Sequence, residues 1–298
     1  MKKTIVTASV LAVSVLALTG CVHNQPKTPA AEKSPMAAHV TVDSKAQALL
    51  PAAIRSAGTL EIGTNLTYAP DEFKDPNGAP TGWGIALATA ISEKLGLKPN
   101  FHDSQFDNIL PGLQGGKYDI GWASFTDNQE REKVVDFVDY YTAGVQWASL
   151  KGKNIDPMNA CGLTVAVGTG TYQETDEIPA KSAACVAAGK AAINKLKLDT
   201  QTDITNAVVL GRADAMSADS PVTQYAVKQT GDKLQLTGSI MESAPFGAAV
   251  AKSNSSLRDA VAAATQSLID DGTYAQILDE WGVQAGAVKK VMVNGAAN

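Results

Sequence analysis

Segments with helical periodicity alternate with short strand-like segments along most of this chain, and this alternation restricts the possible fold more than any other feature. The first cycle contains expected helices over residues 46–56, 84–95 and 106–113, expected strands over 59–63 and 118–122, and a Glu- and Arg-rich helix from Thr126. Strands separated by helices predict an α/β fold with mainly parallel sheets.

A second cycle of the same kind begins near Gly162. It contains an expected strand over 163–167, a helix from Thr171, and a helix–Gly–strand segment over 208–216 that resembles residues 113–120 of the first cycle. The expected C-terminal helices cover residues 256–270 and 273–281. We therefore expect two lobes of similar architecture, not a repeat of fixed period, and 298 residues are enough for two cores.

Composition and charge exclude several classes of protein. Hydrophobic residues make up 45% and charged residues 18% of the chain, which excludes a mainly disordered or fibrous protein. The formal net charge of −5 argues against a wide nucleic-acid interface, which would need a basic surface. The histidines His23, His39 and His102 lack zinc-binding spacing, and no Gly-x4-Gly-Lys-Ser/Thr motif occurs, so we expect no metal site and no bound ATP.

The N-terminal residues have the pattern of an export signal. Two lysines precede an uncharged segment over 5–18 that is short for a membrane span, and Leu18-Thr-Gly-Cys21 follows. This resembles a bacterial lipobox, so residues 1–20 are predicted to be a lipoprotein signal peptide and Cys21 the lipid anchor; an ordinary signal peptide is the alternative. Residues 21–45 are predicted to be a flexible tether. The protein is therefore expected outside the cytoplasm, anchored to the cell membrane.

This location changes the expectation for the cysteines. With Cys21 lipidated, Cys161 and Cys185 remain as an even pair in an oxidising compartment. We expect them to form a disulfide that closes a loop of about 25 residues, with two buried free thiols as the alternative.

The segment Gly168-Thr-Gly170 follows an expected strand and precedes a helix. A dinucleotide fingerprint would need a third glycine and an acidic residue after the next strand, so no cofactor is expected. Free N–H groups at the helix start could instead bind a small anion or polar ligand. No Gly-x-Ser-x-Gly motif or Ser-His-Asp arrangement indicates a hydrolase.

A series of segments matches one family in the same order. The segments are 58–78, 81–83, 106–113, 116–119, 124–126, 130–137, 168–171, 211–215, 219–221 and 271–274. Together they resemble family 3 extracellular solute-binding proteins, the receptors of polar amino-acid ATP-binding-cassette (ABC) importers. The resemblance implies a two-lobed periplasmic-binding-protein-like fold (type II) with a ligand in the interlobe cleft of a monomer. The implied boundaries are 46–144 and 247–298 for lobe 1, 145–246 for lobe 2, and crossing hinge segments near 143–148 and 242–246.

The resemblance assigns the two charges of an α-amino acid to opposite lobes. Arg131 matches the family's carboxylate-binding arginine, and a guanidinium offers the planar pair of donors that suits a carboxylate. Asp219 matches the family's ammonium-binding acid. Composition alone would favour a solvated helix residue for Arg131 and a turn residue for Asp219. The spacing of Ser124, Thr126 and Arg131 favours the site instead.

Further substrate-binding residues follow from the same resemblance. Tyr68 would cover the substrate, Phe106 would form the opposite apolar wall, and Asn65 would contact the substrate's side chain. The residues expected to supply backbone and hydroxyl groups are Ala123, Ser124 and Thr126 from lobe 1, and Thr171 and Tyr172 from lobe 2. Relatives often carry an acid at the position of Asn65, so the neutral amide weakens the case for a strictly cationic substrate.

Several positions near this site depart from the family. Gly84 and Ala86 stand where the family often has acids, and Asp71 stands where it usually has Phe. The acidic pair of Asp71 and Glu72 could favour a basic substrate, but we expect a solvated acidic loop.

We therefore predict a lipid-anchored binding protein, not an enzyme, that captures a polar amino acid and delivers it to an ABC permease with its ATPase subunits. A ligand held between the lobes would favour the closed state that the permease recognises. One alternative is a secreted dehydratase of cyclic substrates on the same fold, with Asp71 or Glu72 as a general acid. The other is a receptor that senses an amino acid and signals through a partner.

Overall fold

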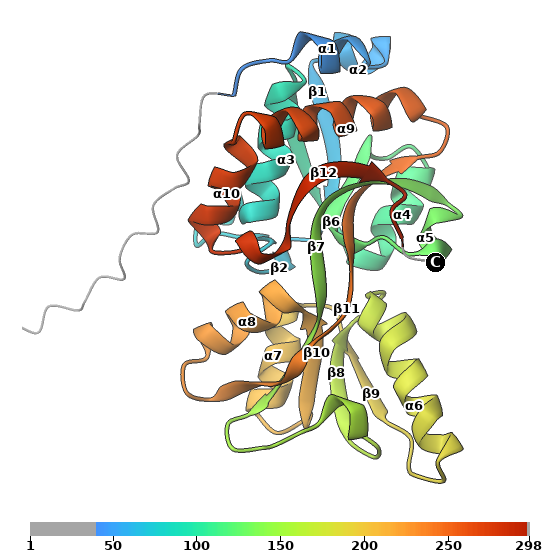
Figure 1. The fold of residues 1–298 in the computed structure, drawn as a ribbon, viewed down its shortest axis with the longest axis vertical. Helices are drawn as coiled ribbons and strands as arrows, with labels where there is room; N and C mark the ends of the chain where they lie inside the picture. Colours follow the sequence, from blue (N-terminus) through green and yellow to red (C-terminus); the bar gives the residue numbers. More distant parts are fainter. Residues whose placement is uncertain (1–39, 297–298) are drawn as a thin grey trace, which may run out of the picture. The chain divides into compact units, whose positions relative to one another are not determined.

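The computed structural model describes residues 40–296, so the predicted signal peptide, the lipid-anchor Cys21 and most of the tether lie outside the described residues. Strands and helices alternate as predicted, and the main sheet has the strand order β5-β1-β6-β11-β7-β10-β8-β9. Separate groups of helices pack against the two halves of this sheet, each around its own core (Figure 1). We call these two groups of elements lobe 1 and lobe 2.

Lobe 1 is built on parallel strands, and its core contains the fully buried Trp83, Trp122 and Tyr140. Its main strands are β1 (Thr59–Thr64), β5 (Lys98–Asp103) and β6 (Ile120–Thr126). A small sheet of β2 (Thr67–Tyr68), β3 (Glu72–Lys74) and β4 (Pro80–Thr81) lies beside them. The remaining elements are α1 (Ser44–Ala48), α2 (Ala52–Ala57), α3 (Trp83–Lys94), α4 (Phe106–Gln114), α5 (Gln129–Glu132), α9 (Ser255–Asp270), α10 (Thr273–Trp281), η3 (Gln284–Gly286) and β12 (Ala287–Val293).

Lobe 2 repeats the parallel architecture on a smaller scale. Its strands are β8 (Thr164–Gly168), β9 (Asn194–Leu198) and β10 (Ala215–Asp219). Its helices are η1 (Pro157–Asn159), the π-helix η2 (Gln173–Glu177), α6 (Ile178–Ala187), α7 (Gln201–Val209) and α8 (Ser220–Gln229). Cys161 and Cys185 form the predicted disulfide, which joins the segment before β8 to α6.

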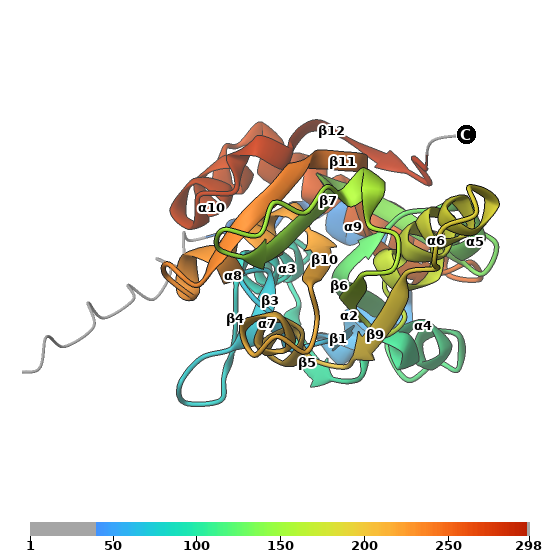
Figure 2. The ribbon, with the colours of Figure 1, turned by 90° about the horizontal axis from the view of Figure 1, so that it is seen from below.

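Two long strands connect the lobes. β7 (Val135–Leu150) and β11 (Leu234–Ala251) pair in antiparallel fashion and lie side by side in both ribbon views (Figures 1 and 2). On β7, Tyr140 belongs to the lobe 1 core and Trp147 to a lobe 2 core. The β7–β11 register is irregular on both sides of Met241, and Glu242 has a positive φ of 49°. The hinge segments expected near 143–148 and 242–246 lie within these strands, while the lobe boundaries stay a prediction.

Three local predictions in lobe 1 were wrong. The first expected helix is interrupted by Pro51, because proline lacks the N–H that would continue the helix; α1 and α2 lie on either side of it. The strand expected over 118–122 is β6, which starts later and runs to Thr126 because its end pairs with β11. The helix expected from Thr126 is therefore α5, which begins only after Asn128.

Candidate functional site

One cavity is lined by residues of both lobes, near the carboxyl ends of β6, β8 and β10. Its lining includes every substrate-binding residue expected from the resemblance, namely Asn65, Tyr68, Phe106, Ala123, Ser124, Thr126, Arg131, Thr171, Tyr172 and Asp219. The other lining residues are Thr67, Gly168, Thr169, Gln173, Asp199, Gln201 and Ile204. The empty space is about 480 Å³ with the opening included.

Arg131 lies on the lobe 1 side of the cavity. The Asn128 side chain caps α5 by accepting a hydrogen bond from the Arg131 N–H at 2.9 Å, which fixes the residue shortly after β6. The guanidinium donates from Nη1 to the Thr126 carbonyl at 2.8 Å and from Nη2 to the Gly170 carbonyl of lobe 2 at 3.0 Å. Burial lowers the pKa of Arg131 to about 10, and the charge of Asp219 opposes this effect. Arg131 therefore stays charged at neutral pH.

Asp219 lies on the lobe 2 side, at the end of β10. Its side chain is buried, and its two oxygens accept hydrogen bonds from different lobes. Oδ2 accepts from the Tyr68 hydroxyl of lobe 1 at 2.7 Å, and Oδ1 accepts from the Gln173 amide at 2.9 Å. Burial raises the pKa of Asp219 to about 6, although these hydrogen bonds and the charge of Arg131 oppose the rise. Its carboxylate is therefore mainly ionised at neutral pH.

Arg131 and Asp219 thus bring one positive and one negative charge to the lining from opposite lobes. Both take part in contacts that link the lobes, Arg131 with Gly170 and Asp219 with Tyr68. The Phe106 ring centre lies 5.6 Å from the guanidinium carbon and gives this side of the cavity an apolar surface. Such an arrangement can hold a small zwitterion whose carboxylate faces Arg131 and whose ammonium faces Asp219.

Other expected site residues have polar groups that already bond within the protein. Asn65 donates to the Ser104 carbonyl at 2.8 Å and accepts from the Thr67 hydroxyl at 2.6 Å. The Tyr172 hydroxyl donates to Glu242, on the crossing strand β11, at 3.1 Å. Asn65 is therefore held in one orientation, and Tyr172 connects the lining to the proposed hinge.

The glycine-rich loop after β8 leads into the helix start where free N–H groups were expected. The helix expected from Thr171 begins as the π-helix η2 and continues into α6. The Gly170 N–H donates to the Glu174 side chain at 3.4 Å, and the Thr171 N–H donates to the Gly168 carbonyl at 3.3 Å. Internal hydrogen bonds thus occupy two of the N–H groups at this helix start, and the site for a small anion or polar ligand stays a prediction.

Asp71 and Glu72 do not form the solvated loop that we expected. Both side chains are completely buried, and neither lines the cavity. Asp71 Oδ1 accepts from the Trp83 indole N–H at 2.6 Å. The Ser124 hydroxyl lies 3.0 Å from Asp71 Oδ2 and 3.1 Å from Glu72 Oε2. Packing of β3 against α3 buries these acids, and their polar sequence neighbours gave no sign of it.

Sequence reasoning missed Gln173, the residue that holds Asp219 from its own lobe. Its position directly after the predicted residue Tyr172 was the available signal. It also missed Asp199 and Gln201, which line the cavity just after β9. Because β8 and β9 are parallel neighbours, their carboxyl ends meet at one edge, and this rule could have identified Asp199.

The sequence profile of the bacterial extracellular solute-binding proteins, family 3, matches residues 60–284. The chain belongs to this family. This family 3 protein is similar to the arginine-binding protein ArgT of Corynebacterium glutamicum, with 42% identity over 250 residues that cover 83% of this chain and 82% of ArgT. The predicted family is therefore confirmed.

Two solved structures of an ancestral arginine-binding protein are similar to this family 3 protein. The structure bound to arginine has a TM-score of 0.69 and 34% identity, and the match covers 75% of this chain and 98% of that one. The structure bound to glutamine has a TM-score of 0.69 and 35% identity, over 76% and 98% of the two chains. These likenesses confirm the predicted two-lobed α/β fold.

Residues 40–296 contain neither a membrane-spanning helix nor a metal-binding cluster. No helix in this range is long and apolar enough to cross a bilayer. Within the same range, no cluster of three or more His, Cys, Asp or Glu side chains could hold a metal ion.

Proposed function

We propose that this protein is a lipid-anchored, extracytoplasmic receptor that captures an α-amino acid with a long polar side chain and delivers it to an ABC permease. L-Arginine is the first candidate. The observation that carries the proposal is that Arg131 and Asp219 come from opposite lobes and line one cavity. Every free α-amino acid carries a carboxylate and an ammonium group, and these two residues match both charges.

The rest of the lining is compatible with a long polar side chain. Asp199 adds a carboxylate, and Thr67, Gln173 and Gln201 add hydroxyl and amide groups. A guanidinium has five N–H donors, which carboxylate and amide oxygens can accept. ArgT is named for arginine, which supports L-arginine as the first candidate. The ancestral protein bound to glutamine supports a neutral polar ligand as the second.

The positions of Asp71 and Glu72 favour a binding protein over an enzyme. The dehydratase alternative assigned the general acid to Asp71 or Glu72, and both are buried outside the lining. A ligand that replaces the contacts between the lobes would favour a closed state, which a permease can recognise. A sensing receptor would use the same closure with a signalling partner instead of a permease.

A thermal-shift screen against the standard amino acids tests the proposal. L-Arginine at one hundred times its Kd should increase the free energy of unfolding by about 2.7 kcal/mol, which raises Tm by several degrees. Agmatine, which lacks the α-carboxylate, is the matched control and should shift Tm much less at the same concentration. If no amino acid raises Tm, the proposed function is wrong.

The membrane anchor is tested independently of the ligand. The segment Leu18-Thr-Gly-Cys21 supports lipidation at Cys21. Cys21→Ser should abolish lipid labelling and release the protein from membranes. Unchanged retention on membranes would contradict the anchor and leave the ligand proposal unaffected.

A further inference from the structure

Two carboxyl groups lie together in the interior of lobe 1, directly behind the cavity wall. Asp71 and Glu72 are both completely buried, and the Ser124 hydroxyl lies within 3.2 Å of three of their oxygens. The Trp83 indole donates to the remaining Asp71 oxygen at 2.6 Å. In the part of the chain that the structure describes, no lysine or arginine forms an ion pair with either group. Ser124 also lines the cavity, so this residue connects the buried pair to the candidate site.

The Glu72 carboxyl group occupies the space beside Gly84. A Cβ atom at Gly84, in the first turn of α3, would lie only 2.2 Å from Glu72 Oε1. The glycine therefore leaves the space that the carboxyl group occupies. Glu72 therefore brings a carboxyl group from β3 to the place where a side chain on α3 would begin.

Ser124 needs such support, because its backbone conformation is unfavourable. Its φ is 49°, a region that L-residues other than Asn and Asp seldom adopt. The β6–β11 ladder is also interrupted here, since Gly121 pairs with Ala249 and Phe125 pairs with Gly247. The three β6 residues between these pairs face a single β11 residue, so the strand bulges here, and two of the three, Ala123 and Ser124, line the cavity.

Two adjacent buried carboxylates without a cation repel each other, and sharing a proton relieves the repulsion. Burial is the main cause that raises the pKa of both Asp71 and Glu72, and for Glu72 the charge of Asp71 adds to it. The titratable groups that face the pair from other elements are Tyr68 on β2, Tyr140 and Tyr141 on β7, and Asp219 on β10. None of these groups supplies a positive charge, so a proton is the available means of neutralising the pair.

We propose that Asp71 and Glu72 are positioning residues of the ligand site, which share a proton and thereby hold the Ser124 hydroxyl and the bulge at the cavity wall. Loss of the shared proton lets the two carboxylates separate, and the bulge loses its support. Ligand affinity therefore falls as the pH rises above neutral. This inference rests on the proposed function for its ligand, but the geometry of the pair is independent of it.

Calorimetry with L-arginine between pH 6.5 and 8.5 tests the proposal. The Kd of the wild-type protein should rise with pH, approaching tenfold per pH unit once the pair ionises. Glu72→Gln cannot lose this proton and should abolish the slope. Glu72→Ala, which also removes the support, should weaken binding at every pH. A Glu72→Gln variant that keeps the wild-type slope would overturn the proposal.

Lobe 2 offers a matched control for this experiment. Glu177 is also buried, with the Trp147 indole donating to it at 2.7 Å and the Ser217 hydroxyl at 2.6 Å. None of these three residues lines the cavity. Glu177→Gln removes a buried acid that an indole and a hydroxyl also contact, although the Lys181 ammonium lies 3.8 Å from it, and should leave the slope of Kd against pH unchanged. If it abolishes the slope as Glu72→Gln does, the effect belongs to buried acids in general and the proposal is wrong.

A second measurement separates this proposal from the identity of the ligand. The Trp83 indole N–H donates to Asp71, so its NMR resonance reports the ionisation of the pair without any ligand. The resonance should move with a midpoint above pH 7 in the wild type and stay fixed in Asp71→Asn. If L-arginine does not bind but the resonance behaves in this way, the ligand assignment fails while the shared proton stands. A midpoint near pH 4 would overturn the shared proton.

Discussion

At the scale of residues, the hydrogen-bond partners of Arg131 and Asp219 are all uncharged groups. Arg131 donates to two backbone carbonyls, and Asp219 accepts from the Tyr68 hydroxyl and the Gln173 amide. Charge-assisted hydrogen bonds are roughly twice as strong as neutral ones, and those between two ionised groups gain most. A ligand carboxylate and ammonium can therefore displace these contacts without leaving either side chain unpaired.

The raised pKa of Asp219, about 6, predicts that ligand binding depends on pH. An ammonium group binds the ionised carboxylate, so the affinity for L-arginine should fall as the pH decreases from 7 to 5, by up to about tenfold per pH unit below the pKa. Without ligand the sign is opposite: burial disfavours the ionised form, so Asp219 lowers stability as the pH rises through about 6.

Calorimetry between pH 5 and 7.5 checks this dependence. Asp219→Asn should bind L-arginine weakly, and its affinity should not fall further as the pH decreases from 7 to 5. Asp139 is a suitable control, because burial also raises its pKa to about 6 although it lies outside the lining. Asp139→Asn should keep the wild-type slope. An affinity of the wild-type protein that is constant from pH 5 to 7 would refute the role of Asp219.

At the scale of elements, the sequence predicted helix ends most accurately where a glycine marks the end. α10 covers Thr273–Trp281 as expected, since Gly272 and Gly282 flank it with positive φ values of 85° and 70°. The end of β6 was missed because it depends on pairing with β11, which lies far along the chain. Local patterns cannot report a boundary that a distant partner determines.

The candidate site was predictable only through the ordered family segments. Tyr68 and Asp219 are separated by 151 residues, and no periodicity connects them. Asp71 and Glu72 stand before the turn residues of Pro76-Asn-Gly78, so their burial could not be read from the local sequence. It results from packing against α3 and from the space at Gly84.

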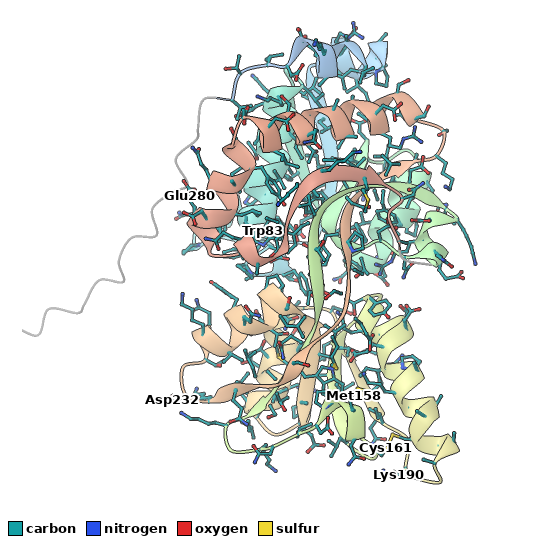
Figure 3. All side chains as sticks on the ribbon, in the orientation of Figure 1. Trp83, Met158, Cys161, Lys190, Asp232 and Glu280 are labelled. Atoms are coloured by element: carbon teal, nitrogen blue, oxygen red, sulfur yellow. A yellow bond between two sulfur atoms is a disulfide. The ribbon has the colours of Figure 1, made fainter. Side chains whose placement is uncertain are left out.

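The Cys161–Cys185 disulfide is expected to stabilise lobe 2 without affecting the ligand site. Its cysteines are separated by 24 residues, for which chain entropy predicts about 3–4 kcal/mol. Cys161 lies at the end of lobe 2 that is distant from lobe 1 (Figure 3), and neither cysteine lines the cavity. The double variant Cys161→Ala/Cys185→Ala should lose about this free energy of unfolding in denaturant titrations, with an unchanged Kd for L-arginine. A large rise in Kd would contradict this separation.

At the scale of the whole molecule, the lobes are linked by β7 and β11 and by contacts across the cavity. Tyr68→Phe removes the hydrogen bond to Asp219, so without ligand the lobes should open further and the radius of gyration in solution scattering should increase. Saturating L-arginine should reduce it again. Tyr274→Phe removes hydrogen bonds within lobe 1 and should leave the scattering unchanged. Identical scattering for the wild type and Tyr68→Phe would refute the role of this hydrogen bond in holding the lobes together.

The central claim is that Arg131 binds the α-carboxylate and Asp219 the α-ammonium of one ligand. Removing one partner of a desolvated charge pair costs about 2–5 kcal/mol. Arg131→Ala and Asp219→Ala should therefore each weaken L-arginine binding by about 30-fold to several thousandfold.

Calorimetry of both variants with three ligands tests the claim most directly. The ligands are L-arginine, agmatine, which lacks the carboxylate, and 5-guanidinopentanoic acid, which lacks the ammonium. Arg131→Ala should no longer prefer L-arginine over agmatine, and Asp219→Ala should no longer prefer it over 5-guanidinopentanoic acid. If either variant binds L-arginine as tightly as wild type, or keeps the wild-type preference, Arg131 and Asp219 do not bind these two groups.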